Sequence, residues 1–261
     1  MQPLYRYLCG VQYTLKKSLG QHFLRDENIC RKIVEAVAAE HPSRLLEVGP
    51  GGGALTRHLL DLPAVEFKAI ELDEEKVQYL LHMYPQLAGK LVHRNFLEAE
   101  PPFDAPFMVV GNFPYNISSQ ILFKVLEWKS QVTSVVGMFQ KEVAQRVAAR
   151  EGSKTYGILS VLVQAFFEVD YLFDVSEQCF VPPPKVKSGV IRLRPAAVVP
   201  DMKSEAAFFL LVKTAFNQRR KMLRNGVKGL FDATTLQDPL FSKRAEQLSV
   251  QQFAALTYLM K

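Results

Sequence analysis

The chain has 261 residues, of which 48% are hydrophobic and 22% are charged, a composition typical of one large globular domain with a smaller companion. No apolar run reaches the roughly 18 residues that a membrane-spanning helix needs, and the N-terminus lacks the apolar core of a secretory signal. We therefore expect no membrane association and a cytoplasmic protein. The three cysteines are scattered, which fits a reducing compartment and predicts no metal site.

The net charge of +6 is unevenly distributed along the chain. Residues 1–25 carry four basic side chains and no acid, and residues 201–261 carry ten basic side chains against five acidic ones. The middle of the chain is therefore slightly acidic. Basic ends on such a body are typical of a polyanion-binding protein, and a solvated surface would have the same composition.

Residues 1–14 show no periodicity and are expected to form a loose arm. Apolar runs then predict strands separated by segments with helical spacing. The predicted strands are 44–48, 66–72, 90–93, 107–110 and 132–139. Strand alternating with helix predicts an α/β fold, a Rossmann-like parallel sheet with helices on both faces.

The pattern changes after residue 150. Residues 158–167 suit a buried helix, residues 169–175 and 188–193 suit two further strands, and only helical patterns follow residue 204. Because residues 195–200 contain two prolines and no periodicity, we place a boundary there. The expected organisation is an arm over 1–14, an α/β domain over 15–195 and a small all-helical domain over 196–261.

Residues 108–117, Met-Val-Val-Gly-Asn-Phe-Pro-Tyr-Asn-Ile, form the most informative stretch. Apolar residues end a buried strand, a glycine stops it, and Pro114 fixes its own φ while biasing Phe113 toward an extended backbone. Asn112 and Tyr115 then project from a rigid turn. An amide followed by an aromatic face suits a nucleobase, although a plain strand-to-helix loop would explain the same residues.

A glycine-rich turn, Gly49-Pro-Gly-Gly-Gly53, follows the first predicted strand of the alternation, and Glu71 ends the second. Glycines let a ligand touch the backbone, and an acid near this spacing binds the ribose of adenosine ligands in doubly wound folds. The alternative for Glu71 is a structural role, because an acid at a helix N-terminus also stabilises the helix. The turn lacks the usual Gly-x-Gly-x-x-Gly order and any phosphate-binding lysine. With the acidic Glu47 before it, this favours a cationic, phosphate-free ligand, S-adenosylmethionine, and methyl transfer over hydride transfer.

Seven motifs occur in an order that is specific to one family. They are Leu19-Gly-Gln-His-Phe-Leu24, Glu47-Val-Gly-Pro-Gly51, Ile70-Glu-Leu-Asp73, Gly111-Asn-Phe-Pro-Tyr-Asn-Ile-Ser118, Gln140-Lys-Glu-Val143, Phe180-Val-Pro-Pro-Pro-Lys-Val186 and Ala215-Phe-Asn-Gln-Arg-Arg-Lys221. Over residues 15–260 the chain resembles the small-subunit ribosomal RNA adenine N6-dimethyltransferases, the KsgA family. The resemblance implies that S-adenosylmethionine is used to dimethylate two adjacent adenosines near the 3′ end of small-subunit (16S) ribosomal RNA, in small-subunit biogenesis.

The resemblance also implies roles for individual residues. The implied cofactor contacts are His22, Leu24, Gly49, Glu71, Asn95 and Asn112. Asn95 stands where the family usually has an acid facing the cofactor's adenine amino group. We expect its amide oxygen still to accept from that amino group and its NH2 group to donate to a ring nitrogen. Phe113 replaces the leucine common in the motif.

The chemistry expected of the site is placement rather than covalent catalysis. If Asn112 and a backbone carbonyl around Pro114 accept the two hydrogens of the target amino group, its nitrogen can pyramidalise toward the methyl group. Tyr115 is expected to stack on the target base with Phe180 on its other face, and plain core positions are the alternatives for both. These four residues are the predicted catalytic set.

The basic segment before residue 225 is the predicted RNA contact. It is expected to lie on a helix and to bind phosphates through Arg219, Arg220, Lys221 and Arg224, and a solvated helix face is the alternative. The expected partners are small-subunit ribosomal RNA and the pre-ribosomal particle, bound by a monomer. The alternative functions are an RNA-binding assembly factor with dispensable catalysis and a large-subunit relative that confers macrolide resistance. DNA- and protein-methylating relatives usually have Pro where Phe113 stands.

Overall fold

The computed structural model describes residues 5–8, 11–14 and 22–261. The chain divides into two compact units, one formed by residues up to 144 together with 170–194, the other by 145–169 together with 195–261. Residues 145–169, which we expected in the α/β domain, therefore group with the C-terminal helices. Residues 1–14, expected to lack regular structure, contain an antiparallel strand pair, β1 (Tyr5–Leu8) and β2 (Val11–Thr14).

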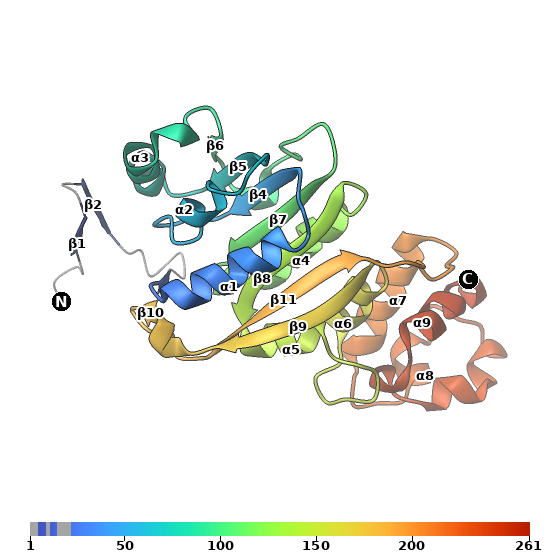
Figure 1. Cartoon of the computed structure of the whole chain (residues 1–261). Helices are drawn as coiled ribbons and strands as arrows, with labels where there is room; N and C mark the ends of the chain where they lie inside the picture. The colour runs from blue at the N-terminus through green and yellow to red at the C-terminus, as the bar shows by residue number, and fades with distance from the viewer. Residues whose placement is uncertain (1–4, 9–10, 15–21) are drawn as a thin grey trace. The chain divides into compact units, whose positions relative to one another are not determined.

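The centre of the first unit is a seven-stranded sheet (Figure 1). Its strand order is β6-β5-β4-β7-β8-β11-β9. The bounds are β4 Arg44–Val48, β5 Glu66–Glu71, β6 Leu91–His93, β7 Phe107–Asn112, β8 Val132–Gln140, β9 Phe167–Val175 and β11 Ser188–Pro195. The strands from β6 to β8 are parallel, and β11 pairs with β8 in the antiparallel sense. The chain order reverses between β4 and β7, which is where α/β sheets bind ligands.

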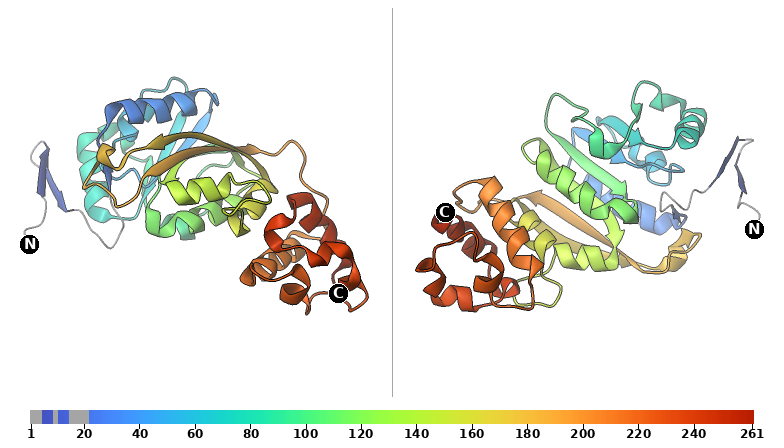
Figure 2. Two further views of the ribbon diagram at one scale, coloured as in Figure 1. Left: turned by 90° about the horizontal axis from the view of Figure 1, so that it is seen from below. Right: turned by 180° about the vertical axis from the view of Figure 1, so that it is seen from behind.

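Helices cover both faces of this sheet, with α1 on one face and α4 on the other (Figure 2). The helices of this part of the chain are α1 Glu27–Ala38, α2 Thr56–Leu59, α3 Glu74–Met83, α4 Ser118–Glu127 and α5 Lys141–Val147. Helix α1 begins at Asp26, whose carboxylate accepts hydrogen bonds from the backbone N–H groups of Asn28 and Ile29, as expected of an N-cap. These elements confirm the expected Rossmann-like α/β class.

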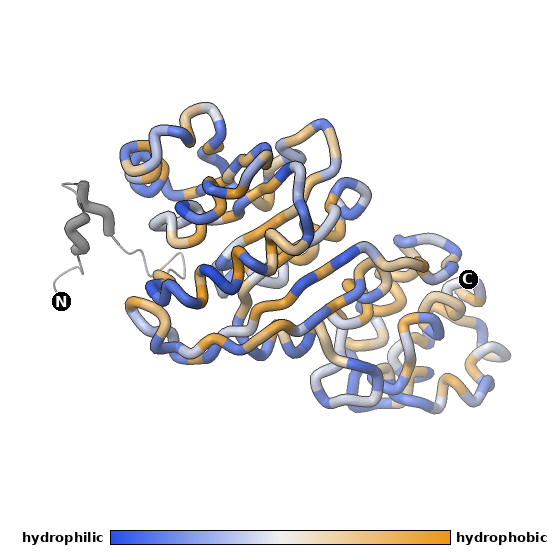
Figure 3. Tube along the Cα trace, viewed as in Figure 1, coloured by the Kyte–Doolittle hydropathy of each residue, from blue (hydrophilic) through white to orange (hydrophobic). Residues whose placement is uncertain are grey.

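The core forms because the central strands are apolar on both faces. Figure 3 shows hydrophobic residues concentrated along them. Ile33 and Val37 of α1 pack in one cluster with Leu45 of β4 and Val110 of β7, and all four are fully buried. Burial of each such side chain stabilises the fold by about 1.5–3 kcal/mol.

The second unit consists mainly of helices and turns. Its strand residues are the first three of β9 and the last one of β11. Its helices are α6 Ile158–Gln164, α7 Glu205–Asn217, α8 Leu223–Val227 and α9 Val250–Leu256, with short 3-10 turns at Thr235–Gln237, Pro239–Ser242, Ala245–Gln247 and Thr257–Leu259. The aromatic residues Phe208, Phe241 and Phe253 are fully buried among them. Within the described residues, no helix is both long and apolar enough to cross a membrane.

The prediction that residues 219–224 lie on one helix is wrong. Helix α7 ends at Asn217, residues 218–221 form turns, and only the last two residues of the segment belong to α8. The backbone leaves the helical region at Gln218 (φ −122°, ψ 43°), and Met222 is extended and pairs with Arg244. Tertiary contacts therefore override the helical propensity of the arginines and lysine.

Candidate active site

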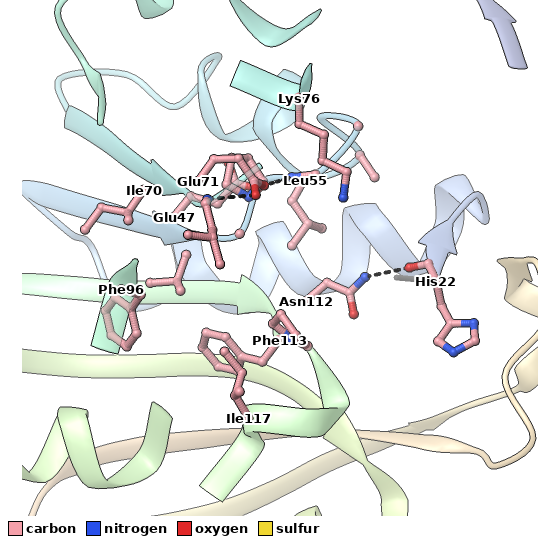
Figure 4. A pocket seen from close by; sticks show the side chains of 18 of the residues that line it. His22, Glu47, Leu55, Ile70, Glu71, Lys76, Phe96, Asn112, Phe113 and Ile117 are labelled. Atoms are coloured by element: carbon pink, nitrogen blue, oxygen red, sulfur yellow. Dashed lines mark hydrogen bonds between the residues drawn. The ribbon is translucent and has the colours of Figure 1, made fainter. Parts of the chain in front are cut away.

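A cavity of about 230 Å³ lies at the carboxyl ends of the parallel strands. Its lining comes from the ends of β4, β5 and β7 and from the segment that precedes α1 (Figure 4). The sheet register brings these ends together, because Glu47 pairs with Val110 of β7 and Val48 pairs with Ile70 of β5. Eight of the predicted site residues line this cavity: His22, Leu24, Gly49, Glu71, Asn95, Asn112, Pro114 and Tyr115.

The glycine turn begins at Gly49, which has a φ of +68°. An L side chain disfavours this left-handed conformation, and glycine adopts it freely. The next close approach is at Gly52, where a Cβ atom would lie 1.8 Å from the ring of Phe23. Phe23 therefore packs directly on the turn and closes one side of the cavity.

Glu71 is held by backbone amides rather than by a cation. Its Oε1 accepts hydrogen bonds from the N–H groups of Leu72 and Asp73, both at 2.9 Å, and its Oε2 accepts from the N–H of Gly51 at 3.0 Å (Figure 4). The side chain is 7% exposed. A carboxylate oxygen has more than one acceptor site, so Oε2 can still accept a ribose hydroxyl. The predicted ribose contact therefore also fixes the glycine turn.

Glu47 is a second carboxyl in the cavity lining, and it is 2% exposed. The Thr56 hydroxyl donates to its Oε2 at 2.7 Å. Burial, opposed by the Thr56 hydrogen bond and assisted by the nearby Glu71, raises the pKa of Glu47 to about 8. The carboxyl is therefore mostly protonated at neutral pH, which differs from the anion expected from the sequence.

Asn95 caps the 3-10 turn Phe96–Glu98. Its Oδ1 accepts from the N–H of Leu97 at 3.1 Å, and its Nδ2 donates to Glu98 Oε1 at 2.9 Å. The oxygen keeps one lone pair for an adenine amino group. One amide hydrogen is bound to Glu98, which leaves the other for the ring nitrogen that we expected it to reach.

Asn112 ends β7 and points across the cavity mouth. Its Nδ2 donates to the backbone oxygen of His22 at 3.4 Å (Figure 4). This bond orients the amide so that Oδ1 remains an acceptor. The second expected acceptor is a backbone carbonyl around Pro114. The carbonyl of Pro114 itself already accepts from Ile117 N and Ser118 Oγ, both at 3.3 Å.

Tyr115 is the aromatic face beside Asn112. Its ring centroid lies 5.6 Å from that of His22 at an interplanar angle of 30°, and its hydroxyl bonds to the hydroxyl of Ser188. Burial raises the pKa of Tyr115, so the hydroxyl stays protonated. Ser188 and Phe23 are not among the predicted site residues, because each makes its contact with a residue far away in the chain. The position of Phe23 between the predicted residues His22 and Leu24 is a local signal for it.

Phe180 is the predicted site residue that the structure does not bring to the cavity. Its side chain is 2% exposed and packs in the hydrophobic core, and its backbone pairs with Leu24 between the short strands β10 (Phe180–Val181) and β3 (Phe23–Leu24). Phe180 therefore occupies a core position, which was the alternative to stacking on the other face of the target base.

The four predicted RNA contacts fall into two pairs. Arg219 is bound to Glu246 and to the backbone oxygen of Lys154, and Arg224 is bound to the hydroxyl of Ser242. Arg220 and Lys221 are exposed, and among the residues that the structure describes no bond or ion pair of their side chains is recorded.

Comparison with known proteins assigns the family. Residues 12–260 match the model of the ribosomal RNA adenine dimethylase family. Proteins named ribosomal RNA small subunit methyltransferase A are 49% identical in Cytophaga hutchinsonii (94% of this chain, 96% of the relative) and 50% identical in Flavobacterium johnsoniae (93% and 94%).

Solved structures agree on the architecture. A dimethyladenosine transferase from Plasmodium falciparum has a TM-score of 0.73 at 24% identity, covering 89% of this chain and 94% of its own. The 23S rRNA methyltransferase ErmE has a TM-score of 0.69 at 26% identity, covering 91% and 99%. The family model's match over residues 12–260 includes residues of both units and every residue that lines the cavity. The chain belongs to the ribosomal RNA adenine dimethylase family.

Proposed function

We propose that the chain transfers methyl groups from S-adenosylmethionine to the N6 amino groups of two adjacent adenosines near the 3′ end of small-subunit ribosomal RNA. The observation that carries this proposal is that residues suited to the cofactor and residues suited to the target base line one cavity at one edge of the sheet. The Gly49 turn with Glu71 forms one half, and Asn112 with Tyr115 forms the other. A match of about 49% identity to small-subunit enzymes over nearly the full length supports the substrate.

The residues present fit the cofactor. Glu71 has a free acceptor site for ribose, Asn95 Oδ1 has one for the adenine amino group, and Ile70, Phe96 and Leu97 supply apolar lining for a base. S-adenosylmethionine supplies a methyl group on a positively charged sulfur. Glu47 lies where a cationic ligand would favour its charged form, so we expect it to lose its proton when that ligand binds.

The target adenine needs to be unstacked and held. Its amino nitrogen is a poor nucleophile because the lone pair is delocalised into the ring. Asn112 Oδ1 accepts one amino hydrogen, which favours a pyramidal nitrogen and stabilises the positive charge that develops as the new C–N bond forms. Tyr115 supplies a stacking face. The proton of the methylated nitrogen leaves to solvent.

Arg220 and Lys221 are the better candidates for phosphate contacts, because Arg219 and Arg224 are used in holding their own turn. The pre-ribosomal small subunit is the proposed form of the substrate, and we place the reaction in the cytoplasm with a monomeric enzyme. A large-subunit target is less well supported, since the large-subunit methyltransferase above is only 26% identical.

The test is methylation of defined substrates. The purified chain is incubated with labelled S-adenosylmethionine and unmethylated small subunits, free 16S RNA or large subunits, and the modified bases are mapped. Two neighbouring dimethyladenosines in small subunits are expected. Asn112→Ala is expected to lower kcat with little change in cofactor Kd, while the exposed Asn225→Ala serves as the matched control. No label in small subunits from an intact, cofactor-binding protein would favour the non-enzymatic assembly factor.

A further inference from the structure

Ser188 is a fully buried polar residue at the beginning of β11. Its neighbour across the sheet is Gln140, the last residue of β8. A hydroxyl in such a place costs free energy unless it forms a hydrogen bond. The bond recorded for the Ser188 hydroxyl, within the described part of the chain, is to the hydroxyl of Tyr115.

Three separate segments meet at Tyr115. The ring follows Pro114, whose φ of −58° fixes the backbone before it. His22 contacts the ring at a centroid distance of 5.6 Å, and the His22 Nδ1 is itself bound to the Pro182 oxygen at 3.0 Å. Ser188 holds the far end of the side chain. A bond to the Tyr115 hydroxyl holds the far end of the ring in place and so restricts χ1, which the backbone alone does not do.

We propose that Ser188 is a positioning residue for methyl transfer, which holds the far end of the Tyr115 ring through its hydroxyl so that the target base stacks in one place. This inference rests on the proposed function of Tyr115 as the stacking face. The hydroxyl–hydroxyl bond is chemically suited to the task, since the buried Tyr115 stays protonated and can donate. Serine acts here through tyrosine and does not touch the substrate.

The experiment compares Ser188→Ala, Tyr115→Phe and the double variant. Each single change removes one end of the same bond, so each is expected to lower kcat for RNA methylation by about 5-fold, the factor that corresponds to one net hydrogen bond. The double variant should be no slower than the slower single variant. Cofactor Kd should not change, and Ser188→Thr, which keeps the hydroxyl, should restore activity.

Ser134→Ala is the matched control. Ser134 lies in β8, is 2% exposed, and has no recorded side-chain bond among the described residues. Ser134→Ala should leave kcat unchanged. Thermal unfolding of both alanine variants separates a loss of stability from a loss of positioning, and Tyr115→Phe tests the same bond if Ser188→Ala does not fold.

Three outcomes decide the matter. A kcat for Ser188→Ala equal to that of the control, or multiplicative losses in the double variant, would overturn the role of Ser188 and leave the proposed function intact. Full activity of Tyr115→Ala would show instead that Tyr115 is not the stacking face, and the proposed site and this inference would fail together. Non-multiplicative losses with rescue by threonine would support it.

Discussion

Gly137 of β8 is predicted to be the position where a single methyl group most disturbs the candidate site. It lies opposite Gly111 of β7 in the parallel register, and the ring of Phe113 packs over both glycines and against Phe139. A Cβ at residue 137 would lie 2.3 Å from Phe113 Cε2 and 2.7 Å from Phe139 Cε2. Gly137→Ala therefore requires the Phe113 ring to move by roughly 1 Å, because ordinary carbon contacts are about 3.5–4.0 Å.

The expected magnitude follows from two opposing effects. Overpacking a core costs about 1–3 kcal/mol, while alanine in a strand gains about 0.5–1 kcal/mol over glycine. The middle of each range leaves a net loss of about 1 kcal/mol, which should lower Tm by roughly 2–4 °C for a chain of this size. Phe113 stands between Asn112 and Pro114, so a shift of about 1 Å should also lower kcat by up to 100-fold.

Thermal unfolding and the methylation assay test this prediction together. Phe113→Leu, which introduces the residue common in the family, removes the clashing ring edge, so the double variant should recover kcat and Tm relative to Gly137→Ala alone. Gly229→Ala is the control, because nothing lies within 4 Å of its added Cβ. A wild-type Tm and kcat for Gly137→Ala, or strictly additive losses in the double variant, would refute the reasoning.

Three further predictions concern charged groups. The pKa of Glu47 is raised from 4.5 to about 8, mainly by burial, so between these pH values the folded protein keeps a proton that the unfolded chain releases. The free energy of unfolding should therefore fall as pH rises from 4.5 to about 8. Glu47→Gln should flatten the decline of Tm over this pH range, and an unchanged slope of Tm against pH would contradict the prediction. The hydrogen bond from Arg194 lowers the pKa of Glu40, so the ionised carboxylate stabilises the folded state above pH 4.5, and this stabilisation should be lost as pH falls below 4.5. Glu40→Gln should lower the free energy of unfolding in urea by about 2 kcal/mol at pH 7 and should weaken its dependence on acid pH. An unchanged dependence of the unfolding free energy on acid pH would disprove the prediction. Replacing Arg220 and Lys221 together by Ala should weaken RNA binding and reduce the salt slope by about 2 at an unchanged Tm, and an unchanged slope would exclude these phosphate contacts.

The sequence predicted best those elements whose signal is local. The apolar runs predicted β4 and β7, and Asp26 predicted the start of α1, because burial and capping depend on neighbouring residues. The glycine turn and Glu71 were found because their spacing is fixed by a βαβ unit. Local patterns also identified eight of the residues that line the cavity.

The failures depend on contacts between distant residues. The basic segment 219–224 has helical propensity, and a helix was predicted there. The contacts that break the helix, Arg219 with Glu246 and Met222 with Arg244, join residues that are distant in the sequence. An aromatic residue in a proline-rich motif suits a base as well as a core, and only the tertiary structure places Phe180 in the core. The bond between Tyr115 and Ser188 joins residues 73 positions apart, which no periodicity reveals.

The direction of β11 determines what the chain can place at the catalytic edge. A purely parallel sheet offers that edge only the residues that follow each strand. Because β11 runs against β8, it delivers the residues that come before a strand, namely the proline-rich segment and Ser188. Ser188, which holds the Tyr115 hydroxyl, thus comes from a part of the sequence separate from the residues that line the cavity. Substitution of Ser188 can therefore alter the surroundings of Tyr115 without changing a residue that lines the cavity.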